Sequence, residues 1–419
     1  MANPPRDLLP VDGEPEVVAA RPLAEVRNDP LRVAIVTASL GLAGAEKQAF
    51  YMARALAETG VAVRVLNLSP GGAYEDALRE LKVESRHFGW LPGAPLRIPI
   101  LMAALRGFRP HIIQSVHAYT NAYSSIAGRL LRIVSVGGMR SDFHTCLTNN
   151  GRFSRWLLTA PDAIAVNSRR AMDDARRCGW LDPSRIHYLP NAIDLAPFPG
   201  QALTDRTEKQ ECTCICVGRL LPSKRVDVFI RAIAAASARR PGVRGIVVGY
   251  GPESANLRRL AADLGLLPDV LKFLGYRFDV AAQLRQSSVF VFCSESEGTP
   301  NVILEAMAAR LPVITTPAGD AADVVEPAGA GYVVPFGDVD ATANAIIQLA
   351  ESPALRSNLG KAGREYVERD RAISDLGARL LKMYADIART SSRKELLKRV
   401  LQNAEAVTRP SGVCAGGEV

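Results

Sequence analysis

Short apolar runs alternate with amphipathic segments along most of this chain. Helices are expected in the amphipathic segments, because apolar residues recur there at helical spacing. The runs are apolar at nearly every position, as in strands that are buried on both faces of a sheet. Strands are expected at 32–38, 61–68, 84–88, 111–116, 133–137 and 163–167, and helices near 45–59, 74–82, 97–108, 121–131 and 152–159. The pattern predicts a parallel sheet flanked by helices.

The alternation stops at LPNAIDLAPFPGQALTDRTEKQ (189–210), which is rich in proline and polar residues, and then begins again. The second series has expected strands at 213–218, 244–249, 270–275, 288–293 and 312–316 and helices at 224–239, 254–264, 279–286 and 300–310. Further helices are expected at 340–350, 354–368 and 371–388. Two such series in tandem predict an α/β protein with two Rossmann-like domains facing each other across a cleft.

The same pattern sets the expected domain boundaries. They are a disordered leader at 1–30, a first domain at 31–195, a linker at 196–210, a second domain at 211–370, a closing helix at 371–389 that packs back on the first domain, and a flexible tail at 390–419.

The composition is that of an ordinary globular protein, and its charge is unevenly placed. Of the 419 residues, 48% are hydrophobic and 22% are charged, which excludes a mainly disordered chain. The net charge is +8, and residues 31–200 carry 20 basic and 12 acidic residues, whereas 201–389 carry 23 and 22. A basic first half attracts a phosphate-rich partner. No nucleic-acid-binding motif accompanies the charge, so we expect no nucleic acid among the partners.

Cysteine usage and hydropathy indicate a cytoplasmic protein. The seven cysteines are scattered and odd in number, which fits a reducing compartment. Cys212, Cys214 and Cys216 alternate along an expected strand and are interpreted as small core residues, since zinc sites usually contain C-x2-C pairs. No apolar run approaches the ~18 residues needed to cross a membrane, and the N-terminus lacks a signal sequence.

The most informative segment is SESEGTPNVILEAMAARLPVI (294–314). An expected strand ends in a polar loop that contains Glu297, and a helix follows with proline in its first turn, where a missing N–H costs nothing. Free N–H groups in that turn can bind phosphate or sugar oxygens. Glu305 follows Glu297 by eight residues and lies on the helix. The next segment, LPVITTPAG, is apolar and is expected to hold the loop on the core.

This segment resembles the Glu–seven residues–Glu signature of glycosyltransferase family 4, also called glycosyl transferases group 1. Five other segments resemble motifs of the family in the family's order, and the resemblance covers roughly 31–388. They are LGLAGAEKQAFYMARAL (40–56), YLPNAIDLAPF (188–198), CVGRLLPSKRVDVFIRAI (216–233), GIVVGYGPESANLRRLAADLGL (245–266) and VLKFLGY (270–276). The resemblance implies the GT-B fold and a retaining transfer of a sugar from a UDP- or GDP-sugar.

The resemblance assigns the donor to the second domain. Arg219 and Lys224 would contact the diphosphate, where cations stabilise the charge that develops on the leaving phosphate. Glu305 would bind the ribose hydroxyls. The implied donor-binding set is Gly44, Gly218, Arg219, Lys224, Gly249, Gly251, Glu297, Gly298, Thr299, Pro300, Asn301, Val302 and Glu305, and the implied catalytic set is Arg219, Lys224, Glu297 and Arg140.

The first domain would supply the acceptor side, with Glu46, His117, Arg140 and His144. Many members of the family carry a histidine where GGMRSD places Arg140. An arginine there can brace the leaving phosphate or bind an anionic acceptor, but it cannot shuttle protons near neutral pH. His144 and His117 are the alternative histidines, and for each the other interpretation is a structural residue.

The resemblance further implies an acceptor that is a glycan or is lipid-linked, in the synthesis of surface polysaccharide, lipopolysaccharide or glycolipid. No cofactor and no metal are expected, and the sequence contains no H-E-x-x-H motif. Two alternatives stay open, which are a nucleotide-sugar epimerase of the same fold and a non-catalytic carbohydrate-binding relative.

Two basic apolar segments in the first domain suggest contact with a membrane. They are PLRIPILMAALRGFRP (95–110) and GRFSRWLLTAP (151–161), in which arginines flank apolar and aromatic residues. Such segments can seat at anionic headgroups, and the alternative is that both simply pack on the sheet. The hypothesis is peripheral docking on the inner face of the cell membrane.

Overall fold

The structure is a computed structural model, and it describes residues 30–89, 94–199 and 211–390. Residues 1–29 of the expected leader, 200–210 of the expected linker and 391–419 of the expected tail lie outside the described residues.

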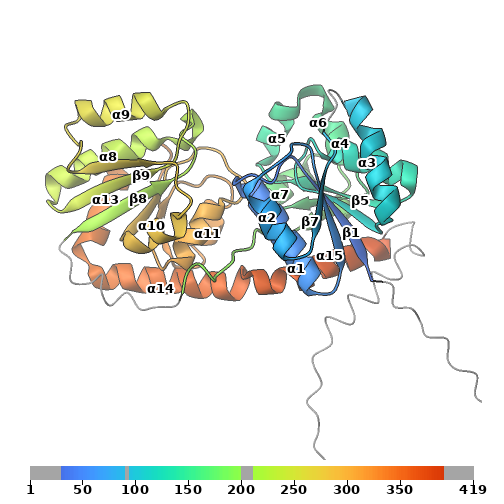
Figure 1. The fold of residues 1–419 in the computed structure, drawn as a ribbon. Coiled ribbons are helices and arrows are strands. Elements are labelled where there is room, and N and C mark those ends of the chain that lie inside the picture. Colours follow the sequence, from blue (N-terminus) through green and yellow to red (C-terminus); the bar gives the residue numbers. More distant parts are fainter. Residues whose placement is uncertain (1–29, 90–93, 200–210, 391–419) are drawn as a thin grey trace, which may run out of the picture. The chain divides into compact units, whose positions relative to one another are not determined.

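The first half of the chain forms a parallel seven-stranded sheet in the order β3-β2-β1-β4-β5-β6-β7 (Figure 1). The internal strand β1 pairs with β2 on one side, where Val33 lies opposite Val63, and with β4 on the other, where Val33 lies opposite Ile112. The strands are β1 (Arg32–Thr37), β2 (Ala62–Asn67), β3 (Glu84–His87), β4 (Ile112–Ser115), β5 (Val134–Met139), β6 (Ala163–Val166) and β7 (Ile186–Tyr188).

The second half forms a parallel six-stranded sheet in the order β10-β9-β8-β11-β12-β13. Its strands are β8 (Cys212–Val217), β9 (Val243–Val248), β10 (Leu271–Gly275), β11 (Val289–Phe292), β12 (Val313–Thr315) and β13 (Gly331–Val333). In both sheets the strand order reverses beside the first strand, which is the Rossmann arrangement. The expected fold of two Rossmann-like domains is therefore confirmed.

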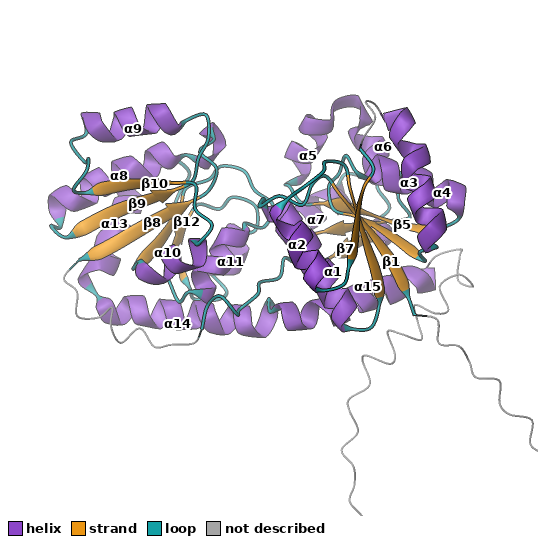
Figure 2. Ribbon diagram, in the orientation of Figure 1, coloured by secondary structure: helices purple, strands orange, loops and turns teal. Residues whose placement is uncertain are grey.

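Helices cover both sheets (Figure 2). In the first half they are α1 (Gly44–Glu58), α2 (Ala73–Glu80), α3 (Ala94–Phe108), α4 (Asn121–Leu131), α5 (Phe143–Asn150), α6 (Ser154–Thr159) and α7 (Arg169–Arg177). In the second half they are α8 (Val226–Arg239), α9 (Ser254–Asp263), α10 (Val280–Gln286), α11 (Asn301–Ala308), α12 (Ala321–Val325), α13 (Val339–Glu351), α14 (Pro353–Asp370) and α15 (Leu376–Thr390).

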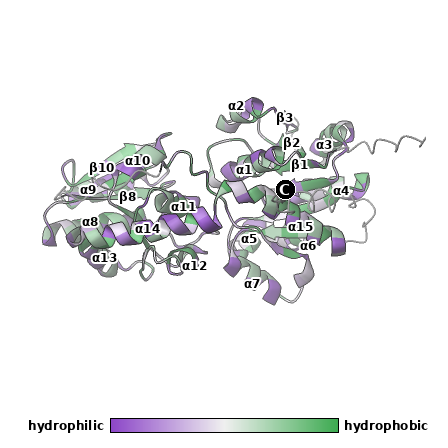
Figure 3. Cartoon of the chain, turned by 90° about the horizontal axis from the view of Figure 1, so that it is seen from below, coloured by the Kyte–Doolittle hydropathy of each residue, from purple (hydrophilic) through white to green (hydrophobic). Residues whose placement is uncertain are grey.

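Each sheet has its own hydrophobic core, and much of the ribbon around the strands has the green of apolar residues in Figure 3. α15 belongs to the core of the first sheet, because Leu380 and Tyr384 pack in one cluster with Met52 and Leu56 of α1. The alternating cysteines of β8 are all buried in the core of the second sheet, as expected.

The sequence pattern did not predict β7, β13, α5, α7 and α12. The two strands have three residues each, and α7 (RRAMDDARR) is so polar that only Ala171, Met172 and Ala175 are buried. The helix expected at 371–388 is shorter, since α14 ends at Asp370 and a 3₁₀ turn at Ile373–Asp375 precedes α15.

Candidate functional site

Two loops leave the carboxyl edges of the sheets where the strand order reverses, which is where ligands bind in such sheets. The first, residues 38–43, joins β1 to α1, and the second, residues 293–300, joins β11 to α11. A hydrogen bond joins the helices that follow these loops. The side-chain amide of Asn301, the first residue of α11, donates to the carbonyl oxygen of Gly44, the first residue of α1, at 2.8 Å. A Cβ at Gly44 would lie 2.9 Å from Asn301 Nδ2, so any larger residue there would have to displace the Asn301 amide.

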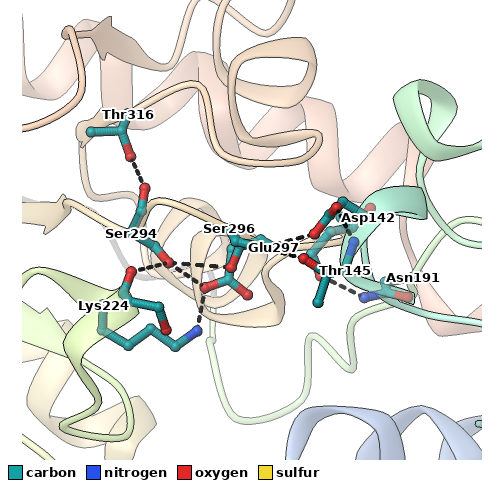
Figure 4. Close-up of polar contacts among 10 residues, drawn as sticks. Asp142, Thr145, Asn191, Lys224, Ser294, Ser296, Glu297 and Thr316 are labelled. Carbon is teal, nitrogen blue, oxygen red and sulfur yellow. Dashed lines mark hydrogen bonds and ion pairs between the residues drawn. The ribbon is translucent and has the colours of Figure 1, made fainter. Parts of the chain in front are cut away.

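The second loop is held firmly by its own domain. Thr316 donates to the carbonyl oxygen of Ser294 at 2.5 Å, and the Ser294 hydroxyl donates to Glu297 Oε1 at 2.8 Å (Figure 4). Gly319, at φ +56°, packs so closely that a Cβ there would lie 1.9 Å from the Gly298 carbonyl oxygen. The expectation that the segment after α11 holds the loop on the core agrees with these contacts.

Charged groups from two loops of the second domain meet beside Glu297. Lys224 forms an ion pair with Glu297, and its Nζ lies 5.7 Å from the centre of the Phe292 ring. Arg219 is exposed, and it has no ion pair in the described part of the chain. The two cations expected at a diphosphate are therefore one paired lysine and one unpaired arginine.

Glycines allow the neighbouring loops of the second domain to pack against each other. Gly249, at φ +141°, follows β9, and a Cβ there would lie 1.8 Å from the carbonyl oxygen of Gly218. Gly251 likewise faces the carbonyl oxygen of Leu220, at 2.4 Å from a built Cβ. Three of the expected donor-binding glycines, Gly218, Gly249 and Gly251, thus lie together along the carboxyl edges of β8 and β9.

Glu305 lies on α11, one turn after Asn301, and is 8% exposed. Its Oε1 accepts a hydrogen bond from Lys47 of α1 at 2.5 Å. This ion pair raises the pKa of the Lys47 ammonium, although burial acts in the opposite direction. Val302, from the same expected set, is half-buried beside Asn301. Lys47 is a residue that the sequence reasoning missed.

Asn191, which lies in the YLPNAID segment, joins the two domains and was also missed. Its amide donates to the Thr299 carbonyl oxygen at 2.8 Å and to Asn301 Oδ1 at 2.7 Å. Its Oδ1 accepts from Arg140 at 2.8 Å. Asn191 is 3% exposed, so one buried amide orients Arg140 and the start of α11 together.

Arg140 follows β5, and its backbone lies against the loop of Glu297. A Cβ at Gly298 would lie 2.6 Å from the Arg140 carbonyl oxygen. Besides Asn191, its guanidinium contacts Met52 Sδ at 3.6 Å. No carboxylate pairs with Arg140 in the described ranges, and burial lowers its pKa to about 10. Arg140 is therefore a charged group at neutral pH that is held by neutral partners.

His117 and Glu46 lie together beside the first loop. His117 Nε2 is 3.6 Å from Glu46 Oε1, and Glu46 also accepts from Ser39 at 3.2 Å. Burial, and then the charge of Arg140, lower the pKa of His117 to about 4, so His117 is neutral at pH 7. Its Nδ1 is buried without a hydrogen-bond partner among the described residues.

His144 does not lie with Arg140, His117 and Glu46. It is exposed on α5, where its ring contacts Phe143 at 5.8 Å. Its neighbour Asp142 instead accepts from Ser296 at 2.7 Å, which links α5 to the loop of Glu297 (Figure 4). Backbone and hydroxyl hydrogen bonds of Thr145 and Ser296 lower the pKa of Asp142, despite the opposing effect of burial.

Asp320 makes another connection that the sequence did not reveal. Its carboxylate accepts from Ser168 Oγ at 2.5 Å and from the backbone N–H of Arg169 at 2.9 Å, at the start of α7. It also accepts from Thr299 Oγ1 at 3.3 Å. A carboxylate of the second domain thus caps a helix of the first.

The two halves of the chain match two family models. Residues 42–197 match the model described as Glycosyltransferase Family 4, and residues 205–366 match the model described as Glycosyl transferases group 1.

Curated relatives match across both halves. A GDP-mannose-dependent monoacylated alpha-(1-6)-phosphatidylinositol monomannoside mannosyltransferase of Corynebacterium glutamicum is 27% identical over 323 residues, which are 74% of this chain and 78% of the relative. The lipopolysaccharide core biosynthesis glycosyltransferase LpsE of Rhizobium meliloti is 27% identical over 324 residues, which are 77% of this chain and 90% of the relative.

Solved structures share the fold. HepE of Anabaena, crystallised with UDP-glucose, superposes with a TM-score of 0.74 at 19% identity, covering 85% of this chain and 99% of that one. WaaG, a glycosyltransferase involved in lipopolysaccharide biosynthesis, superposes with a TM-score of 0.65 at 18% identity, covering 86% and 100%. These likenesses concern the fold, which is the GT-B fold expected from the sequence.

Proposed function

Because this chain belongs to glycosyltransferase family 4, we propose that it transfers a hexose from a nucleoside-diphosphate sugar to a hydroxyl group of a glycan or lipid-linked acceptor, with retention of the anomeric configuration. The observation that carries the proposal is the ion pair of Lys224 with Glu297 just before the first turn of α11, with Arg219 on the same β8–α8 loop as Lys224. Two cations and free backbone N–H groups suit a diphosphate, and the adjacent carboxylate suits sugar hydroxyls.

In this proposal the ion pairs of the ligand-free protein exchange partners when the donor binds. Lys224 moves its charge from Glu297 to the distal phosphate, and Glu297 becomes free to accept hydrogen bonds from the sugar. Glu305 similarly exchanges Lys47 for the ribose hydroxyls. Arg219, which is already unpaired, needs no such exchange.

The proposed reaction needs no protein nucleophile. The acceptor oxygen forms a bond to the anomeric carbon on the face from which the diphosphate departs, and the bond from that carbon to the phosphate oxygen breaks. The acceptor proton passes to the departing phosphate, which gives a glycoside and a nucleoside diphosphate. Arg140 and Lys224 would stabilise the charge on that phosphate, so catalysis rests on position and charge.

The names of the relatives suggest which donors and acceptors to test first. The Corynebacterium relative is named for GDP-mannose and a phosphatidylinositol mannoside, and the Rhizobium relative for the lipopolysaccharide core. We therefore propose a glycolipid acceptor in the cell envelope, with GDP-mannose and UDP-glucose as the first donors.

A transfer assay tests the proposal. The purified chain is incubated with each labelled donor and a membrane lipid extract, and labelled lipid is measured. Lys224→Ala is expected to lower the rate by about 10²–10³-fold, the usual effect of removing one group that stabilises transition-state charge. The control Lys272→Ala removes an exposed lysine of β10 and should keep the wild-type rate. Donor epimerisation without any transfer would contradict the proposal in favour of the epimerase.

We also propose peripheral contact with an anionic membrane through residues 151–156. Phe153 is 57% exposed and Trp156 is 40% exposed, and the guanidinium of Arg152 lies 4.9 Å from the centre of the Phe153 ring. In the other candidate segment Leu101 and Leu105 of α3 are fully buried, and Leu96 is 51% exposed. Among the described residues no helix is long and apolar enough to cross a bilayer.

Co-sedimentation with vesicles tests this contact. The protein should sediment with phosphatidylglycerol-containing vesicles at low salt, and Phe153→Ser/Trp156→Ser should reduce the bound fraction several-fold, because apolar burial and charge both contribute to such binding. The absence of any binding to anionic vesicles at low salt would refute the contact.

A further inference from the structure

A pocket lies apart from the residues assigned to the donor and the acceptor. It is formed by α7, β7, residues 317–327 and the end of α14 with α15, and its volume is about 1310 Å³. None of the expected donor or acceptor residues lines it. It is adjacent to the loop of Glu297, because Gly319 lines the pocket and packs against the carbonyl oxygen of Gly298.

The pocket carries an excess of positive charge. Eight arginine and lysine side chains line it, against four aspartates. Five of these cations have no ion pair within the described ranges: Arg169, Arg170, Arg176, Arg371 and Lys382. α7, which supplies three of these, is visibly hydrophilic in Figure 3. An excess of cations over carboxylates in one concave surface attracts an anion.

Arg371 is the buried member of this set. It is 5% exposed, and its guanidinium donates to the hydroxyls of Tyr366 at 2.9 Å and Tyr188 at 3.3 Å. Its Nε is buried with no hydrogen-bond partner among the described residues. A guanidinium that is buried without a carboxylate is costly, and a bound anion would supply the missing counter-charge and acceptor.

Arg371 also lies where the chain crosses between the two domains. Its carbonyl oxygen accepts from the backbone N–H of Ile193 at 2.8 Å, and the N–H of Ile373 donates to Ile193 at 3.0 Å. A ligand held by Arg371 and by α7 would therefore contact both the segment that joins α14 to α15 and a helix of the first domain.

We propose that this pocket binds a phosphate-bearing anion. Arginine side chains recognise phosphate with two parallel hydrogen bonds. The wall also contains Tyr188, Pro190 and Pro317, which can face an uncharged organic part of the ligand. A soluble phosphate ester and a phospholipid headgroup share this chemistry.

The test compares two double variants with the same loss of charge. Arg176→Ala/Lys382→Ala removes two exposed pocket cations, and Arg231→Ala/Arg259→Ala removes two exposed arginines of α8 and α9. Because the donor side can also attract phosphate, both are made in a Lys224→Ala background. Equal melting temperatures show that both variants fold.

Calorimetric titration with inorganic pyrophosphate is expected to show about tenfold weaker binding for the pocket variant than for its control, the loss expected for removing charge-assisted contacts. A parallel arm measures co-sedimentation with phosphatidylcholine vesicles with and without phosphatidylglycerol. A selective loss in the pyrophosphate arm identifies a soluble phosphate ligand, and a selective loss in the vesicle arm identifies a headgroup. Equal binding by both variants in both arms overturns the proposal.

Discussion

The two sides of the candidate site hold their positive charge by different means. On the second-domain side, Lys224 is neutralised by Glu297, which also accepts from Ser294. On the first-domain side, Arg140 has an amide and a thioether as partners, and the neighbouring His117 is neutral. One cation must leave its partner to meet a ligand, whereas the other is held in place with its charge uncompensated.

This difference separates two costs of binding an anion. An ion pair stabilises the ligand-free protein but must be broken when a phosphate arrives, whereas a buried unpaired cation destabilises the ligand-free protein and is already oriented. Arg140 therefore provides preorganisation, and Lys224 provides charge that can move. Variants on the two sides should behave differently.

The largest expected effect is on activity. Arg140→Met removes the fixed charge at similar length, and we expect kcat/KM for transfer to fall by about 10²–10³-fold, because charge on the leaving phosphate loses a preorganised partner. Arg140→Lys should recover part of this loss. A change of less than threefold in Arg140→Met would mean that Arg140 does not contact the reacting groups.

The stability of the ligand-free protein should change in opposite directions on the two sides. Arg140→Met is expected to raise the free energy of unfolding by about 1–2 kcal/mol, because a half-buried charge that has no carboxylate partner is removed. Asn191 Oδ1 still accepts from Asn167 in that variant, at 3.2 Å. Lys224→Met is expected to lower the free energy of unfolding by about 1–3 kcal/mol, because Glu297 loses its counter-charge. Urea denaturation measures the free energy of unfolding of both variants. Changes of the same sign would contradict the distinction between a paired Lys224 and an unpaired Arg140.

The neutrality of His117 predicts a pH dependence of stability. Since the folded-state pKa is about 4 and the unfolded-state pKa is near 6.5, the unfolded chain binds more protons between these values. Stability should therefore fall as the pH drops from about 6.5 towards 4, with His117 contributing about 2 kcal/mol of loss between pH 7.5 and pH 5. His117→Gln should show a correspondingly smaller loss in urea denaturation. Equal losses in both proteins would show that folding does not lower the pKa of His117.

The smallest effect on stability is expected at the contact of Ser296 with Asp142, where a hydroxyl group links the two sides. Ser296→Ala removes the hydrogen bond to Asp142 and should lower the free energy of unfolding by about 1 kcal/mol, the usual net value of such a bond. A double-mutant cycle with Asp142→Asn isolates the contact. Full additivity would show that this contact does not couple the two sides.

Much of the second-domain site was predictable because its residues are close together in sequence. Glu297, Asn301 and Glu305 lie in one strand–loop–helix segment, so position along the chain nearly fixes position in space. Lys47, Asn191 and Asp320 were missed, since each acts on a residue more than 100 positions away along the chain. His144 lies four residues from Arg140, yet α5 leaves it exposed.

The sequence by itself determined the two βα series, the paired sheets and the family, because buried parallel strands need continuous apolar runs that are visible in any single segment. It did not determine α7, whose polar residues show little helical pattern and whose first turn is capped by Asp320 from the other domain. Nor did it determine which cations are paired. Only the tertiary structure places Glu297 against Lys224 and leaves Arg140 and Arg371 without a carboxylate, since charge pairing depends on distances between segments that the chain order does not fix.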